Sequence, residues 1–287
     1  MIIDAHAHAQ QTAISREEVD WWKKEAQDYG EKLLEHMDAH GVGTAVILVS
    51  HDRNENNMIQ AAVRKYPKRF VGCCGWGIQK TTTGREAAEV IQKWVKEPEF
   101  KGVGEALLYS LRGTKGLETT VQDVMREMRI VMDVVAAHKV PILFHTGFSG
   151  AHSGKSATPV MWKDPIYLDE LASGYPETPI IIGHSGGLYS PYDQNALIVA
   201  YNHENVFLET SKSRTDVIEQ AVKEIGSSRI LFGSDWTTGE PLPLGPLSER
   251  STHLYDRNIR VVQEARISDE DKERIFYRNV KSLFGMA

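Results

Sequence analysis

The 287-residue sequence has few cysteines, no excess of basic charge and no long apolar run. Its two cysteines, Cys73 and Cys74, are adjacent, so they form no long-range disulfide framework, and a reducing compartment is favoured. The formal net charge of −6 does not suit the basic stripe of a nucleic-acid-binding protein. No run approaches the roughly eighteen apolar residues of a membrane-spanning helix, and no signal-like segment precedes the first apolar run. We therefore expect a cytoplasmic protein with no nucleic-acid or membrane partner.

What the sequence does contain is ordinary globular composition. Hydrophobic residues make up 41% and charged residues 25%, which is enough apolar material for a large core under a solvated surface. No internal repeat, low-complexity segment or linker divides the chain. Because α/β barrels of this length commonly form one domain, we expect a single domain over residues 1–287.

Short apolar runs alternate with segments of helical periodicity. In Thr44–Ser50 nearly every residue is apolar, which is typical of a strand buried on both faces of a parallel sheet. In Thr120–His138 the apolar residues recur near helical spacing. Eight such alternations in a chain of this length favour a closed α/β barrel, the (β/α)₈ TIM barrel, over an open doubly wound sheet. The expected strands are residues 1–8, 44–50, 70–76, 102–106, 140–145, 179–183, 206–209 and 229–232.

Long connections follow some of the expected strands. They span residues 9–30, 146–164 and 236–250. Because TIM-barrel active sites are built at the C-terminal ends of the strands, we expect these loops to lie over the active site.

The first expected strand ends in two histidines, His6 and His8, one residue apart. Alternate side chains of a strand point the same way, so both imidazoles would be aimed at one place. Imidazole is the commonest metal ligand in proteins. Alone this pattern is weak, because two histidines flanking an alanine also arise by chance.

The same kind of side chain recurs at four later strand ends. Glu105, His145, His184 and Asp235 each follow an apolar run, at intervals close to one or two βα units. Each residue alone has a structural explanation, as a surface carboxylate, a core histidine or a helix N-cap. Together they are hard to explain by packing, since buried charge without a partner costs several kcal/mol. We therefore expect these four residues and the two N-terminal histidines to share a divalent metal site.

Several of these residues lie in motifs that resemble a known family. The motifs are IIDAHAH, GVGEA, ILFHTG, IIIGHSGG, LFGSD and IFYRNVKSLFG. They resemble the amidohydrolase superfamily, and within it the amidohydrolase-2 branch, which includes aminocarboxymuconate-semialdehyde decarboxylase, resorcylate decarboxylases, hydratases and lactone hydrolases. The resemblance spans nearly the whole chain and is specific to the superfamily but not to a substrate.

The resemblance implies roles for individual residues. By position, His6, His8, His145 and Asp235 match the metal ligands of the family, and His184 matches its catalytic or second-metal histidine. It also implies a divalent ion, with Zn²⁺ favoured and Mn²⁺ as an alternative, bound as one ion or as two. Family members are often dimers, so a homodimer is compatible with the sequence.

Glu105 departs from the pattern of the family's decarboxylases, which do not typically have a glutamate at this strand. Binuclear hydrolases of the superfamily use a carboxylate there to bridge two ions. We therefore expect a metal-dependent hydrolase that uses metal-activated water on a lactone, amide or ester of a small organic substrate, with Asp235 and His184 catalytic. The alternative is a metal-dependent decarboxylase of an aromatic or muconate-type acid. A third reading is a non-catalytic metal- or ligand-binding barrel.

Further residues near strand ends are candidate substrate contacts. Aromatic side chains suit an apolar or cyclic substrate, and a cationic side chain after the seventh strand could hold a substrate carboxylate. Ordinary packing and solvated loop charges explain them equally well. The candidates are Trp76, Tyr109, Trp162, Trp236, Lys212 and Arg214.

Overall fold

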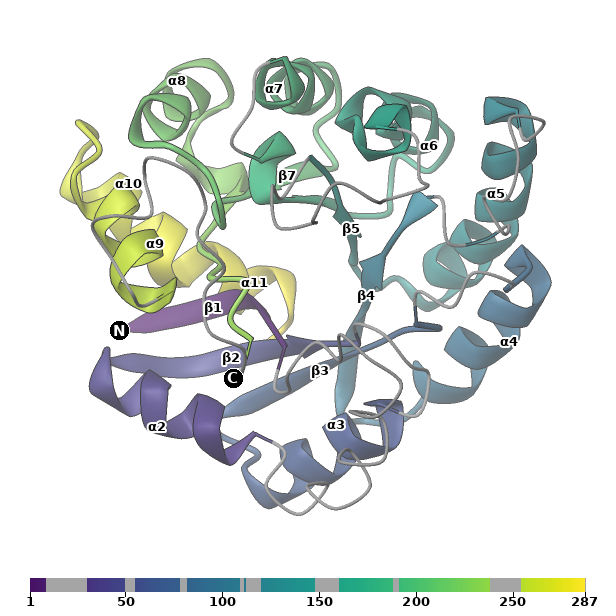
Figure 1. Ribbon diagram of the computed structural model, residues 1–287, viewed down its shortest axis with the longest axis horizontal. Helices are drawn as coiled ribbons and strands as arrows, with labels where there is room; N and C mark the ends of the chain where they lie inside the picture. The colour runs from purple at the N-terminus through teal and green to yellow at the C-terminus, as the bar shows by residue number, and fades with distance from the viewer. Residues whose placement is uncertain are drawn as a thin grey trace.

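The computed structural model describes residues 1–8, 30–49, 55–77, 82–108, 111, 120–147, 160–187, 191–237 and 254–286. Within them, eight strands run parallel in a single sheet, in the order in which they occur along the chain. The sheet curls into a nearly closed barrel surrounded by helices (Figure 1). The predicted TIM barrel is confirmed.

All the strand regions expected from the apolar runs are present. Most of their residues are buried on both faces, as in β6, because helices cover the outer face and side chains fill the interior. The strands are β1 Ile2–Ala7, β2 Val42–Leu48, β3 Phe70–Cys74, β4 Phe100–Ala106, β5 Ile142–His145, β6 Ile180–Gly183, β7 Val206–Glu209 and β8 Ile230–Leu231.

The helices follow the expected alternation, with two differences. The helical segment between β5 and β6 has a 3₁₀ turn, η3 Pro165–Tyr167, and becomes α-helical only from Leu168. The C-terminal helical pattern is divided, and its middle part is the π-helix η7 Arg274–Arg278. None of the described helices is both long and apolar enough to cross a bilayer. The α-helices are α2 Glu31–Ala39, α3 Glu55–Lys65, α4 Gly84–Trp94, α5 Val121–His138, α6 Leu168–Gly174, α7 Tyr192–Asn202, α8 Thr215–Ile225, α9 Leu254–Gln263, α10 Asp269–Glu273 and α11 Asn279–Leu283.

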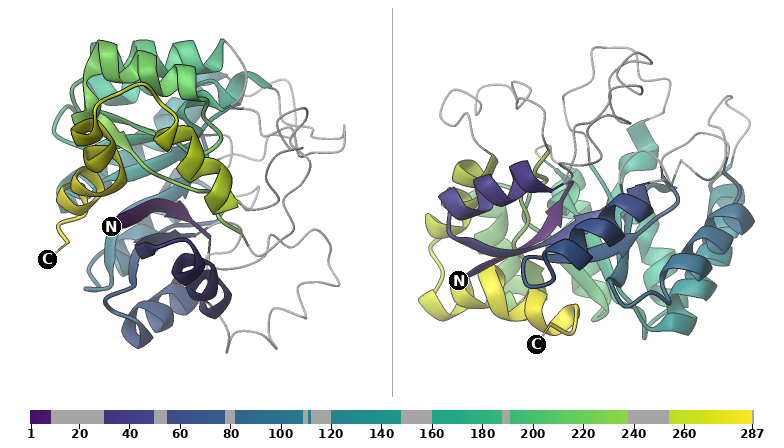
Figure 2. Two further views of the ribbon diagram at one scale, coloured as in Figure 1. Left: turned by 90° about the vertical axis from the view of Figure 1, so that its left-hand side faces the viewer. Right: turned by 90° about the horizontal axis from the view of Figure 1, so that it is seen from below.

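The C-terminal helix closes one end of the barrel interior. Val280 and Phe284 pack in one buried apolar cluster with Ile3 and Leu231, near the beginnings of the strands. Figure 2 shows the yellow C-terminal helices on the same side of the barrel as the start of β1. The opposite end, where the strands finish, is therefore the end left for a site.

The barrel is completed where the segment after β8 meets β1. The Ala5 amide donates to the Phe232 carbonyl over 2.8 Å, and the Asp235 amide donates to the His6 carbonyl over 2.8 Å. The buried carboxylate of Asp4 also joins the two segments, since it accepts hydrogen bonds from Ser234 Oγ at 2.5 Å and from the Ser234 amide at 3.0 Å. This pairing places the histidines of β1 beside Asp235.

Asp4 is further tied to the helical layer, because the Tyr255 hydroxyl of α9 donates to it over 2.9 Å. Burial raises the pKa of Asp4 to about 6, although the hydrogen bonds from Ser234, the His6 amide and Tyr255 oppose the rise. Asp4 is therefore a buried, hydrogen-bonded carboxylate at the point where β1, the segment after β8 and α9 meet.

Candidate metal centre and active site

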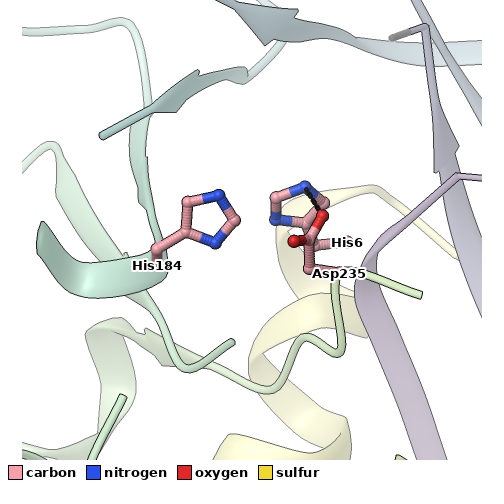
Figure 3. Close-up of side chains that lie close together, drawn as sticks. All are labelled: His6, His184 and Asp235. Carbon is pink, nitrogen blue, oxygen red and sulfur yellow. Dashed lines mark ion pairs between the residues drawn. The ribbon is translucent and has the colours of Figure 1, made fainter. Parts of the chain in front are cut away.

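The structure brings the six expected metal-binding side chains together at the C-terminal end of the barrel. Nε2 of His6 and Nε2 of His8 lie 3.2 Å apart, and Oδ1 of Asp235 lies 3.5 Å and 3.4 Å from them. Figure 3 shows His6, Asp235 and His184 converging from separate elements. The convergence follows from the positions of these residues at the ends of the strands.

Glu105, at the end of β4, lies among all four imidazoles. Its Oε1 is 2.8 Å from Nδ1 of His145 and 3.5 Å from Nε2 of His184. The same carboxylate is 3.5 Å from Nε2 of His6 and 3.5 Å from Nε2 of His8. Glu105 therefore joins the β1 histidines to those of β5 and β6.

These donor atoms fit a divalent cation. Three overlapping groups have one ligand atom from each member within 4.8 Å of the others: His6, His184 and Asp235; His6, His8 and Glu105; and Glu105, His145 and His184. Imidazole nitrogens that face one another at 3.0–3.2 Å in a buried place, with carboxylate oxygens beside them, suit Zn²⁺ or Mn²⁺. The overlap accommodates one ion or a bridged pair.

The charges of the cluster follow from these contacts. Burial would lower the pKa of His8, but hydrogen bonds to Asp235 and Glu105 raise it to about 10. Burial and the nearby Lys212 charge lower the pKa of His184 to about 4. Burial would raise the pKa of both carboxylates, yet the charge of His145 holds that of Glu105, and the charge of Lys212 that of Asp235, well below the usual range.

Glu209, which ends β7, belongs to the site but was missed in the sequence. Its side chain is 0% exposed, and its Oε2 lies 2.8 Å from Nδ1 of His6. The same oxygen accepts the His184 amide at 3.0 Å and the Ser211 hydroxyl at 2.8 Å. The sequence did offer a signal for Glu209, because a carboxylate at the end of a buried strand is the same pattern that indicated Glu105.

The outer nitrogens of two site histidines are therefore held by the protein. Glu209 holds Nδ1 of His6, and Ser211 Oγ lies 2.7 Å from Nδ1 of His184. Such contacts fix the ring orientation and the tautomer. They leave Nε2 of both rings facing the cluster.

Of the two cationic candidates, the structure brings only Lys212 to the cluster. Its Nζ lies 2.5 Å from Oδ2 of Asp235 and 3.4 Å from Nε2 of His184. Arg214 instead pairs with Asp193 at 3.0 Å and with Asp216 at 3.1 Å. Of these two candidates, Lys212 is therefore the one positioned to bind an anionic group at the cluster.

The described aromatic candidates are buried in the hydrophobic core. Trp76, Trp162 and Trp236 all belong to the larger of the two buried apolar clusters. The Trp236 indole also packs against His36 of α2, with ring centroids 5.3 Å apart and Nε1 3.3 Å from Nδ1. Packing accounts for these contacts. Tyr109 lies outside the described residues, as do most of the three long loops expected over the site.

Comparisons with known proteins find a family and relatives that match nearly the whole chain. A family model described as Amidohydrolase matches residues 3–286. A gamma-resorcylate decarboxylase from Polaromonas sp. (strain JS666) is 25% identical over 305 residues, covering 90% of this chain and 87% of that protein.

Solved structures with the same fold include enzymes of different activity. One is a 4-oxalomesaconate hydratase from Rhodopseudomonas palustris, with a TM-score of 0.67 and 18% identity over 100% of this chain and 96% of that one. Another is a dihydroxybenzoic acid decarboxylase from Polaromonas sp. JS666 with bound manganese and the inhibitor 2-nitroresorcinol, with a TM-score of 0.61 and 20% identity over 99% and 97% of the two chains. At these identities the structures establish the fold.

Proposed function

This chain belongs to the amidohydrolase family, and from that premise we propose that it is a metal-dependent decarboxylase of a hydroxylated aromatic carboxylic acid. The observation that carries the proposal is the Lys212 ammonium, 2.5 Å from Asp235 and 3.4 Å from Nε2 of His184. It provides a cation for a substrate carboxylate beside the candidate metal ligands. The gamma-resorcylate decarboxylase among the relatives supports this choice over the hydrolase expected from Glu105.

In this proposal His6, His8 and Asp235 hold a divalent ion, with Glu105, His145 and His184 close enough to complete its coordination. When bound, the ion supplies Lewis-acid polarisation of the substrate carboxylate and a neighbouring oxygen. Both Zn²⁺ and Mn²⁺ suit imidazole and carboxylate donors. The manganese in the Polaromonas decarboxylase supports Mn²⁺ as strongly as the donor set supports Zn²⁺.

The side chains of the chain itself perform the proton chemistry. Breaking the bond between the ring and the carboxylate leaves an electron pair on a ring carbon, and that carbon must gain a proton as CO₂ departs. The pKa values of Asp235 and His184 lie below neutrality, so neither group carries this proton at rest. The Lys212 ammonium contacts both groups and is the proton source in this proposal, with Asp235 or His184 passing the proton on to the ring carbon.

The test is CO₂ release from carboxylated phenols, beginning with 2,6-dihydroxybenzoate, by protein loaded with Mn²⁺ or Zn²⁺. The metal-loaded protein should release CO₂, Asp235→Asn should abolish turnover, and Lys212→Met should raise KM and lower kcat. Arg214→Gln is the matched control, because that cation is paired away from the cluster and its loss should leave KM unchanged. Absence of CO₂ release from every carboxylated phenol would exclude the proposal.

A binuclear hydrolase remains the second candidate, and the position of Glu105 favours it. The carboxylate reaches both the β1 histidines and His145, as a ligand bridging two ions would. In that reaction Asp235 would accept a proton from the attacking water. The hydrolase predicts two metal ions per chain, one ion in Glu105→Gln, and cleavage of lactones or esters, whereas a mononuclear decarboxylase predicts a single ion in both proteins and no such cleavage.

A further inference from the structure

A second cleft lies on the outside of the barrel, away from the metal cluster. Its volume is about 600 Å³, and residues of the β7–α8 connection, α8 and α9 line it. α8 and α9 are in contact with each other in the helical layer, at the upper left of Figure 1. None of the six candidate metal ligands lines this cleft.

Arg257 of α9 presents an uncompensated positive charge in the cleft. Its Nη1 is buried and has no hydrogen-bond partner within the described parts of the chain. Burial lowers the pKa of the guanidinium, and among the described residues no carboxylate charge opposes the change. A guanidinium remains charged in proteins, so this partly buried cation has no counterion among the described residues.

A second polar group of the cleft is also without a partner. Ser213 is 2% exposed, and among the described residues its buried Oγ makes no hydrogen bond. The hydroxyl can donate or accept, and Arg257 can only donate. Ser213 and Arg257 both line the cleft, which is the arrangement expected when an acceptor from outside the chain completes them.

The carboxylates of the cleft do not neutralise Arg257. Asp216 is held by Arg214 at 3.1 Å, and Glu219 is held by Arg266 at 2.9 Å. Glu264 also lines the cleft, but its charge is not among the influences on Arg257.

The N-terminus of α8 adds to the positive potential of the cleft. The helix begins at Thr215, and the residue before it, Arg214, makes no side-chain capping hydrogen bond. The first amides of a helix carry partial positive charge and favour anions. Val261 and the carbon chains of the arginines provide apolar surface beside these donors.

We propose that this cleft binds a small organic anion through a carboxylate or phosphate group held by Arg257 and Ser213. The planar guanidinium matches both groups bidentately. The volume lies within the range of about 300–1,000 Å³ typical of small-molecule sites, so the cleft has room for an anion larger than a bare ion. This site goes beyond the proposed decarboxylase and does not depend on it.

The test is calorimetric titration of the metal-loaded protein with benzoate and, separately, with inorganic phosphate and phenyl phosphate. Saturable binding of at least one of these probes is expected, and Arg257→Met should weaken it by at least tenfold. Arg266→Gln is the matched control, because this cleft arginine is paired with Glu219 and its loss should weaken binding less than threefold. Binding should persist in Lys212→Met, which separates the cleft from the metal cluster.

Thermal unfolding provides a second readout. Without anion, Arg257→Met should unfold at the same temperature as the wild type or higher, because it removes an uncompensated buried charge. The bound probe should raise the wild-type Tm and leave that of Arg257→Met unchanged. Binding of benzoate alone would assign the cleft to carboxylates, and binding of a phosphate probe would assign it to phosphates. Equal affinity of wild type and Arg257→Met, or no saturable binding of any probe, would overturn the proposal.

Discussion

Oε2 of Glu209 lies 2.8 Å from Nδ1 of His6, so a fully buried carboxylate determines which nitrogen His6 presents to the cluster. Contacts of this kind orient metal-binding histidines, and their loss commonly weakens metal affinity by about 10–100-fold. We expect a loss of this size in Glu209→Gln, measured by competition with a chromophoric chelator.

The control for this variant is Glu219→Gln, which removes an outer-layer carboxylate on α8 and should leave metal affinity unchanged. Circular dichroism of the metal-free variant separates a local effect from unfolding. Wild-type metal affinity in a folded Glu209→Gln protein would show that Glu209 does not position His6.

Metal binding should release protons near neutral pH. Without metal, His8 has a pKa of about 10, because hydrogen bonds to Asp235 and Glu105 overcome the opposing effect of burial. A histidine ligand must be neutral, so at pH values below this pKa the metal displaces a proton. Apparent affinity should therefore rise about tenfold per pH unit for each proton released. Calorimetry in buffers of different ionisation enthalpy counts the protons, and a pH-independent affinity across neutrality would contradict the assignment of His8.

Stability should depend strongly on Asp4. The carboxylate accepts hydrogen bonds from the Ser234 amide, Ser234 Oγ and the Tyr255 hydroxyl, all buried. Tyr255→Phe removes one of these bonds and should cost about 0.5–1.5 kcal/mol, whereas Asp4→Ala leaves several donors unsatisfied and should cost roughly 3 kcal/mol or more. Urea unfolding of the metal-free proteins measures both. A larger loss of unfolding free energy in Tyr255→Phe than in Asp4→Ala would show that these hydrogen bonds to Asp4 are not what stabilises this part of the fold.

The two cysteines should be unreactive in the folded protein. Burial raises the pKa of Cys74 to about 12 and that of Cys73 well above its usual value, so at pH values near 8 neither side chain is a thiolate. A chromogenic disulfide reagent should modify both thiols in denaturant and neither in its absence. Rapid labelling of the native protein would show that this part of the barrel opens.

The sequence was sufficient for the barrel and for the six clustered side chains, since both depend on local patterns. An apolar run predicts a strand, and the polar residue at the end of the run predicts which side chain lies at the C-terminal end of the barrel. The same rule applied to β7 indicates Glu209, which was missed because no recognised motif surrounds it. The contact of Asp4 with Tyr255 joins residues 251 positions apart and depends on how α9 packs, which no local pattern specifies.

Local conformation also limits what sequence patterns reveal. Lys212 and Arg214 are two positions apart in one connection, yet only Lys212 reaches the cluster. Lys212 has a φ of 57°, a backbone conformation that side-chain-bearing residues seldom adopt, so the direction of its side chain could not be inferred from spacing. The aromatic candidates also show what spacing cannot reveal, because a tryptophan near a strand end can either contact a substrate or pack in the core.

The seam between β1 and the segment after β8 also brings together metal-binding side chains from distant parts of the sequence. The Asp235 amide pairs with the His6 carbonyl at 2.8 Å, so the same contact that completes the barrel sets the carboxylate beside the two histidines. The histidines alone offer only part of the ligand set of the proposed centre. Tight metal binding should therefore require a closed barrel, and a bound ion should in turn hold the two segments together.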